Sequence, residues 1–171
     1  MFYALMIDNN GNGIGSHAYQ EEPSSYPSNE ISCTLAQAQS PMAYQVVNGQ
    51  IVESLSYAKT SQIALLRTAC QSAITGGFTS SALGSAYNYP SDPTSQSNLN
   101  TVAGSPSGGS LWCESGGVWA MKAHTQSQAQ AVLTSFVAWL NSCQSQLATL
   151  TAEVNAATTV SAVQLIAWTN S

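Results

Sequence analysis

The chain has 171 residues, of which three are Lys or Arg and eight are Asp or Glu. Globular domains usually contain about 25% charged residues, whereas this chain contains 6%. Ser, Thr, Gln and Asn together supply 65 residues, so we expect a surface made mostly of hydroxyl and amide groups. Because so few cations cannot neutralise a run of phosphates, the composition argues against nucleic-acid binding.

The composition also argues against secretion and membrane insertion. The first basic residue is Lys59, so the apolar start of the chain lacks the positive segment of a secretory signal. Residues 123–152 are uncharged and long enough to span a bilayer, but Gln and Asn side chains interrupt them. We therefore expect a soluble protein with no membrane insertion.

Residues 1–55 are predicted to form a small β-rich unit. An apolar run at residues 2–7 stops at the turn-forming cluster 8–13, and a hairpin returns through residues 14–19. The cluster matches the first half of a calcium loop, but Tyr19 stands where the loop needs a bidentate Glu, so we expect a plain turn.

The same unit contains a short helix and a second hairpin. Residues 34–39 favour a helix, which must end before Pro41 because the residue preceding proline avoids the α conformation. Asn48-Gly49 lies between the strand-like segments 44–47 and 50–53 and is a strong hairpin signal.

Residues 56–171 are predicted to form a second domain that begins with a helix. Apolar residues repeat at helical spacing from Tyr57 to Ile74, and Gly76-Gly77 ends the pattern. Residues 78–83 are predicted to be a strand or an extended segment, and Tyr87–Pro90 a turn. A helix is expected at 92–102, with Asp92 as N-cap and Pro93 at its first position. A hairpin of 111–114 and 118–122 follows around Gly116-Gly117.

The clearest pattern predicts one long C-terminal helix. Thr125 and Gln128 form a capping box at its start. Apolar residues then recur at alternating spacings of three and four, in the register of a coiled coil. They are Leu133, Phe136, Leu140, Cys143, Leu147, Leu150 and Val154.

This apolar line has two interpretations. The helix packs within the molecule on residues 57–74, or it joins another copy in a homo-oligomer through Leu133, Phe136, Leu140, Leu147 and Leu150. Its flanking positions hold neutral residues, so no charge pattern selects a partner. A last short helix begins at Thr158 or Thr159. The predicted fold class is therefore α+β: an N-terminal β-hairpin unit, then a helical hairpin domain with an inserted β-hairpin and one long C-terminal helix.

The sequence offers no metal, cofactor or catalytic motif. Cys33, Cys70, Cys113 and Cys143 are widely spaced and lack C-x-x-C pairs, so free buried thiols are expected, with a Cys70–Cys143 disulfide as the alternative. His124 precedes the Thr125 cap with no G-x-S-x-G serine in the chain, which favours a structural histidine over a small hydrolase. We expect a protein that is not an enzyme.

Four aromatic residues surround the second predicted hairpin: Tyr87, Tyr89, Trp112 and Trp119. Strand alternation favours Leu111, Cys113 and Trp119 as core residues. If two or more of the four rings instead face outward, the patch would suit a protein partner or a sugar, because aromatic rings give a large contact area at a low entropic cost.

Residues 57–168 resemble a domain family of unknown function found in proteins of tailed bacteriophages and prophages. The resemblance rests on ordered anchors, among them Leu66-Arg67, Cys70, Gly77-Phe78, Tyr89-Pro90, Trp112-Cys113, Val118-Trp119 and His124-Thr125. Residues 41–52 are similar to the N-terminal part of phage tail-fibre assembly proteins. The long helices carry fewer charges here than in that family.

The resemblance implies a tail-fibre accessory role. Such a protein acts as an assembly chaperone or cap, or as a structural tail component, and binds the tail fibre or tail tip. Its place is then the phage virion tail, the host cytoplasm during assembly, or both. The alternative is a host-surface receptor-binding tip module that binds glycans through the aromatic patch. No catalytic residue comes from the resemblance.

Overall fold

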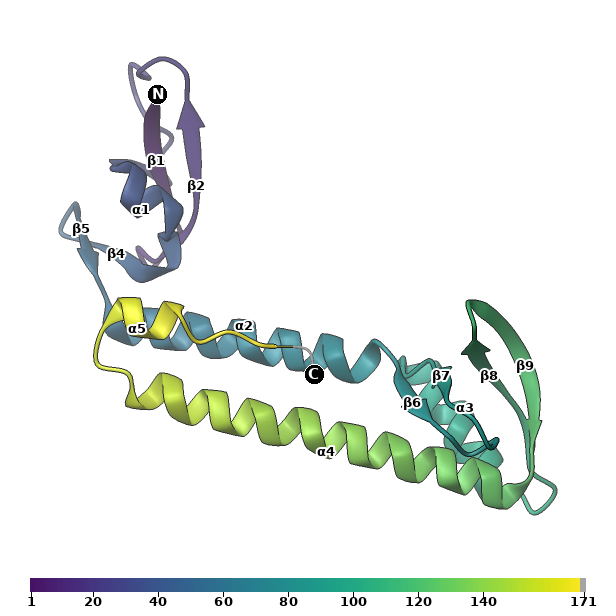
Figure 1. The fold of residues 1–171 in the computed structure, drawn as a ribbon. Coiled ribbons are helices and arrows are strands. Elements are labelled where there is room, and N and C mark those ends of the chain that lie inside the picture. Colours follow the sequence, from purple (N-terminus) through teal and green to yellow (C-terminus); the bar gives the residue numbers. More distant parts are fainter. Residues whose placement is uncertain (170–171) are drawn as a thin grey trace. The chain divides into compact units, whose positions relative to one another are not determined.

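The computed structural model of the protein describes residues 1–169 and confirms the predicted α+β class (Figure 1). The described chain divides into two compact units, residues 1–66 with 150–167, and residues 67–149 with 168–169. Two long helices, α2 (Leu55–Thr75) and α4 (Gln126–Ala156), contribute residues to both units. The predicted domain boundary near residue 55 stays a prediction.

The first unit contains a three-stranded antiparallel sheet in the order β2-β1-β3. The predicted hairpin is confirmed as β1 (Phe2–Ile7) and β2 (Gly13–Tyr19). Strand β3 (Glu30–Cys33) was not predicted, because Ile31 is the one strongly apolar residue in this short segment. Ala4 and Leu5 of the central strand are fully buried.

The other predicted elements of this unit are also confirmed. Helix α1 (Leu35–Gln39) has a capping box in which Thr34 and Gln37 bond each other's backbone. Asn48 and Gly49 both have positive φ and join β4 (Tyr44–Val47) to β5 (Gln50–Glu53). A 3-10 turn, η1 (Pro41–Ala43), precedes β4, and α5 (Val160–Gln164) is capped by Thr159.

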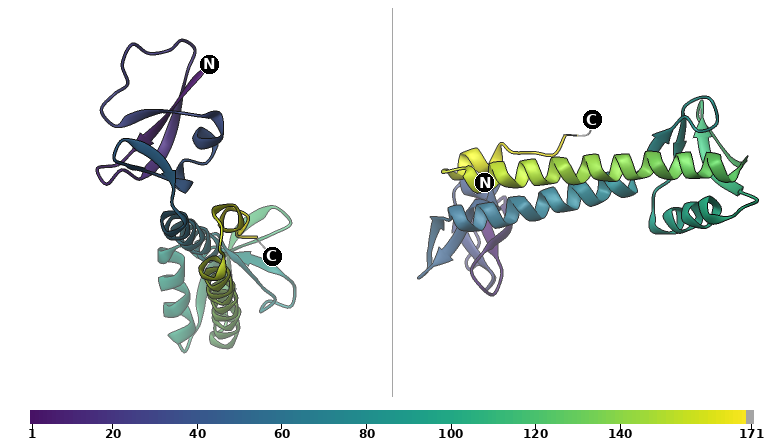
Figure 2. Two further views of the ribbon diagram at one scale, coloured as in Figure 1. Left: turned by 90° about the vertical axis from the view of Figure 1, so that its left-hand side faces the viewer. Right: turned by 90° about the horizontal axis from the view of Figure 1, so that it is seen from below.

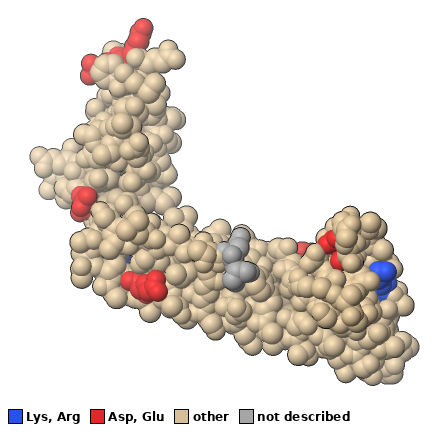
Figure 3. All heavy atoms as spheres, viewed as in Figure 1, with Lys and Arg blue, Asp and Glu red and all other residues tan. Residues whose placement is uncertain are grey.

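The N-terminal end of helix α2 is tied to the first unit by hydrogen bonds. The Tyr57 hydroxyl donates to the Gly13 carbonyl over 2.8 Å, and Gln62 Nε2 donates to the Ile166 carbonyl over 2.6 Å. Both partners are distant in sequence, so neutral side chains link this end of α2 to remote segments of the chain. Few charged groups are visible among the described residues drawn in Figure 3.

The second unit contains a four-stranded antiparallel sheet in the order β6-β7-β8-β9, not a single inserted hairpin. The end of α2 lies beside α4 within this unit (Figure 2), where Trp139 Nε1 donates to the Ala73 carbonyl over 3.2 Å. The remaining elements are β6 (Phe78–Ser80), β7 (Tyr87–Tyr89), α3 (Pro93–Gly104), β8 (Gly109–Ser115) and β9 (Val118–His124).

Two predictions for this unit need correction. The strand expected at 78–83 ends at Ser80, and the turn expected at Tyr87–Pro90 is wrong, because residues 87–89 form strand β7. Tyr89 lies opposite Phe78 with the two rings stacked at 5.7 Å. This buried contact outweighs the turn preference of the neighbouring residues, and Pro90 follows the strand, where its missing N–H costs no hydrogen bond.

The core of the second unit lies between the sheet, α3 and the first turns of α4. The predicted cap Asp92 accepts hydrogen bonds from the Thr94 and Ser95 amides and starts α3. The predicted capping box of Thr125 and Gln128 starts α4. The buried core residues are Phe78, Tyr89, Leu99, Ala103, Leu111, Cys113, Ala129, Val132 and Phe136.

Candidate functional site

The candidate site is the outer face of the β8–β9 hairpin. Gly116 and Gly117 form the two-residue turn, with φ of +62° and +81°. Both values lie in the left-handed region that a type I′ hairpin turn requires, which favours glycine. This turn sets Ser115 opposite Val118 and fixes the register of the whole ladder.

The register separates the residues of the hairpin into two faces. Leu111 and Cys113 point inward and are 5% and 0% exposed. Trp112, Trp119 and Met121 project from the opposite face and are 47%, 45% and 57% exposed. We call these three residues the tryptophan face. Leu111 and Cys113 are core residues as predicted, but the expectation that Trp119 joins them is wrong.

The two tryptophans form one aromatic surface. Their ring centroids lie 6.3 Å apart, and the ring planes differ by 14°. Trp112 faces Met121 across the ladder and Glu114 faces Trp119, so the two rings are diagonal neighbours. Met121 was not predicted to be part of this surface, although residues two apart on a strand lie on the same face and Met121 follows Trp119 by two.

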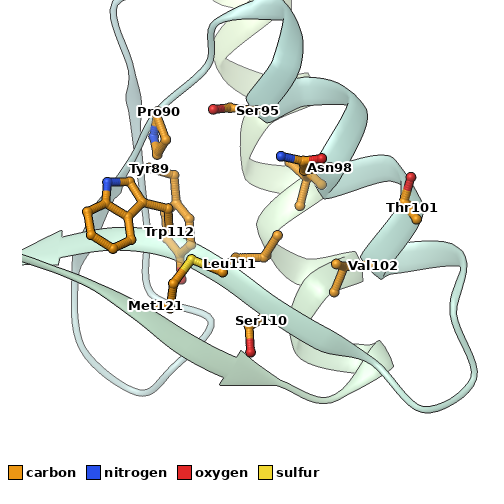
Figure 4. A pocket seen from close by; sticks show the side chains of 11 residues that line it. Tyr89, Pro90, Ser95, Asn98, Thr101, Val102, Ser110, Leu111, Trp112 and Met121 are labelled. Atoms are coloured by element: carbon orange, nitrogen blue, oxygen red, sulfur yellow. The ribbon is translucent and has the colours of Figure 1, made fainter.

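A pocket of about 330 Å³ borders Trp112 on the side of α3 (Figure 4). Trp112, Met121, Leu111 and Val102 supply its apolar lining, and the amide of Asn98 projects from the helix toward this space. Its polar lining also includes Ser95, Thr101 and Ser110. The pocket therefore combines a flat aromatic wall with neutral hydrogen-bonding groups.

A second pocket of about 470 Å³ borders Trp119. Its polar lining includes Thr79, Asn88 and Glu114. Asn88 Nδ2 donates to Glu114 Oε2 over 2.5 Å, and the Gly117 amide donates to the other carboxylate oxygen. The hydrogen bond from Asn88 and, to a smaller extent, the one from Gly117 lower the pKa of the Glu114 carboxyl group. The tryptophan pair therefore has a pocket on each side.

The two predicted tyrosines do not lie on the tryptophan face. Tyr87 is half-buried, and Lys122 Nζ lies 5.5 Å from its ring centroid. Tyr89 is 3% exposed, belongs to the core and lines both pockets. Burial raises the pKa of the Tyr89 hydroxyl, so this group stays a neutral hydrogen-bond donor.

His124 lies at the junction of β9 and α4, as predicted, and is 3% exposed. Its Nδ1 is 2.8 Å from the Lys122 carbonyl oxygen, which only accepts hydrogen bonds, so Nδ1 carries a proton. Its Nε2 is 2.9 Å from the Tyr89 hydroxyl and forms a hydrogen bond with it. Both ring nitrogens therefore hold the junction together, and neither is directed at a pocket.

The apolar line of α4 is covered along part of its length. Phe136 is 7% exposed, and its ring centroid lies 5.3 Å from that of Phe78. Cys143 is also buried, while the other predicted contact residues of the line are half-buried. These are Leu133, Leu140, Leu147 and Leu150. This burial fits the intramolecular interpretation, and self-association through α4 stays a prediction.

All four cysteines are free thiols in the structure. Cys70 and Cys143 are neighbours, with Cys70 Sγ 3.6 Å from the Cys143 carbonyl oxygen, but no disulfide joins them. Burial raises the pKa of both thiols, which lowers their reactivity as nucleophiles.

The calcium-like cluster forms a turn closed by its own side chains. Asp8 Oδ1 accepts from the amides of Asn10 and Asn12, and Oδ2 accepts from Asn12 Nδ2. These bonds lower the pKa of the Asp8 carboxyl group, and the bond from the Asn12 side chain has the largest effect. Across residues 1–169, no three His, Cys, Asp or Glu side chains converge as metal ligands.

Residues 57–167 match the family model of a domain of unknown function (DUF4376). The match covers more than half of the chain, so the protein belongs to this family. No curated protein and no solved structure matches the chain. In the part of the chain that the structure describes, every helix is too short or too polar to cross a bilayer.

Proposed function

We propose that this protein is a non-enzymatic accessory protein of a phage tail that binds a tail-fibre or tail protein through the tryptophan face. It acts as an assembly chaperone or cap, or as a structural component of the tail. Its location is accordingly the virion tail, the host cytoplasm during assembly, or both. The phage assignment is supported by the ordered residues that resemble the phage domain family.

The observation that carries the binding role is the exposure of Trp112, Trp119 and Met121 on one face of a rigid hairpin. Tryptophan is the residue type that most often dominates binding energy at protein interfaces, because its large ring buries much area with few rotatable bonds. Both tryptophan side chains are almost half exposed, so a ligand can reach their rings.

The low charge of the chain supports a durable contact. Hydroxyl and amide surfaces bind by packing and directional hydrogen bonds, which salt screens far less than it screens ion pairs. A complex formed through the tryptophan face should therefore survive high salt. This behaviour suits a structural contact in a particle better than a transient encounter.

A second candidate function is glycan binding by a receptor-binding tip. The two pockets favour it, because each places neutral amides and hydroxyls beside an indole ring. Sugars present apolar C–H faces that pack on aromatic rings and hydroxyl groups that bond to such side chains. The Asn98 amide beside Trp112 and the Asn88–Glu114 pair beside Trp119 would then select the sugar.

Co-expression with a candidate tail-fibre protein tests the first proposal. The wild type should co-purify with the fibre in a fixed ratio, and the double variant Trp112→Ala, Trp119→Ala should lose the fibre while keeping its circular dichroism spectrum. Val137→Ala is a matched control, because Val137 is 44% exposed on α4 outside the tryptophan face. Undiminished capture by the double variant would refute this use of the face.

Binding of the isolated protein to host cells and lipopolysaccharide separates the two candidates. A glycan-binding tip should bind cells without the fibre, and Asn98→Ala should weaken that binding while leaving fibre capture intact. A fibre accessory protein should show fibre capture and no cell binding of its own. Mass spectrometry of purified virions then shows whether it remains in the particle.

A further inference from the structure

Strand β9 has a sheet neighbour on one side only. The sheet order is β6-β7-β8-β9, so β6 and β9 are its edges. Strand β6 has three residues, whereas β9 has seven. Short edge strands are protected from pairing with other chains, whereas long ones present a row of unpaired backbone groups. Figure 1 shows no element beyond β9 on the outer side of this sheet.

The hairpin register identifies the backbone groups on that open edge. A two-residue turn makes Ser115 and Val118 a hydrogen-bonded pair, and bonded pairs then alternate along the ladder. The N–H and C=O groups of Ala120 and Lys122 therefore point toward β8. Those of Trp119, Met121 and Ala123 point away from it, and no backbone hydrogen bond joins them to any of residues 1–169.

The usual protection of an edge is reduced in β9 to one charged residue. Natural edge strands carry outward charges, prolines or bulges that discourage pairing. The one charged residue of β9 is Lys122, which lies over the Tyr87 ring on the face opposite Met121. Trp119 and Met121 flank the open backbone groups with exposed apolar side chains.

We propose that β9 pairs antiparallel with β9 of a second copy of this chain, with the two-fold axis at Met121. This register is the one in which all three outward residues are used, because Trp119 pairs with Ala123 of the second copy and Met121 pairs with Met121. Every outward N–H then meets an outward C=O. The two four-stranded sheets become one continuous sheet, and the two tryptophan faces become neighbours.

Side-chain size and charge agree with this register. The large Trp119 lies opposite the small Ala123, and Met121 lies opposite another flexible methionine. Lys122 lies opposite Ala120, so no like charges face each other across the new ladder. A symmetric antiparallel pair satisfies both copies equally, as an isologous two-fold interface requires.

Sedimentation equilibrium of the full chain tests the proposal. The wild type should dimerise, and Met121→Lys and Met121→Glu should each weaken dimerisation at least about tenfold, because like charges then meet at the two-fold axis. An equimolar mixture of the two variants should recover the dimer. Met121→Gln is the neutral control and should stay dimeric. Met121 is 57% exposed, so these variants should fold, as circular dichroism can check.

Hydrogen exchange provides a second readout with its own signature. Raising the protein concentration should slow exchange at the amides of Trp119, Met121 and Ala123 and leave Ala120 and Lys122 unchanged, because the latter are already bonded to β8. A monomeric wild type, or a dimer that Met121→Lys does not weaken, would overturn the proposal. The second outcome would direct attention to the apolar line of α4.

Discussion

The inner and outer faces of the β8–β9 hairpin hold residues of similar apolar character but opposite burial. Leu111 and Cys113 are buried, whereas Trp112 and Trp119 are almost half exposed. The tryptophan side chains nevertheless have the larger apolar surface. Burial here follows strand alternation and turn register, and residue type has little influence on it. A large aromatic residue held outside by its register marks a surface that is better explained by binding than by folding.

The largest expected difference between the two faces is in stability. Leu111→Ala removes a core side chain and should lower the free energy of unfolding by about 2–5 kcal/mol. Trp112→Ala truncates an exposed ring on the opposite face and should cost less than about 1 kcal/mol. Urea unfolding followed by far-ultraviolet circular dichroism measures both. Equal losses would mean that the two faces have been assigned incorrectly.

The next largest effect on stability is expected at the junction of β9 and α4, where Tyr89 bonds to His124. Tyr89→Phe keeps the stacking on Phe78 but removes the hydroxyl that bonds to His124 Nε2. A buried polar group left without its hydrogen-bond partner costs about 1–3 kcal/mol. Tyr87→Phe is the matched control, since Tyr87 is only half-buried and its hydroxyl has no such buried partner. Denaturant midpoints of the two variants should therefore differ, with Tyr89→Phe unfolding earlier.

The elements and the two faces were not equally predictable from sequence. Asn48-Gly49, Gly116-Gly117, Asp92 and the Thr125–Gln128 box each act on their near neighbours, so the turns and helix starts that they set were predicted correctly. Strand β7 was missed because its reason is a contact between Tyr89 and Phe78, eleven residues apart. Local turn preference at Asn88-Tyr89-Pro90 pointed the other way.

The site shows the same limit. Alternation could place Leu111 and Cys113 on one face and Trp112 on the other, but it could not place Trp119 until the turn length was known. Three residues at Ser115-Gly116-Gly117 would put Trp119 inward, whereas the observed two-residue turn at Gly116-Gly117 puts it outward. The pocket residue Asn98 was beyond prediction because α3 reaches the hairpin only through the tertiary fold.

The smallest expected effect concerns the single carboxylate on the outer face. Glu114 lies opposite Trp119 and bonds to Asn88 and to the Gly117 amide. These bonds lower its pKa in the folded state, so they stabilise the fold above the ordinary carboxyl pKa. This contribution is lost as the pH falls through the lowered pKa. Lowering the pH should therefore destabilise the turn of the hairpin before it destabilises the core.

Glu114→Gln isolates this contribution. The variant should unfold slightly earlier than the wild type at neutral pH, and the gap should close in acid, because protonation removes the same charge from the wild type. Glu22→Gln removes an exposed loop carboxylate elsewhere and should show no such convergence. Thermal melts across the acid range provide the comparison. A gap that stays constant with pH would show that Glu114 stabilises the turn by packing, independently of its charge, and the outer face would then be insensitive to acid.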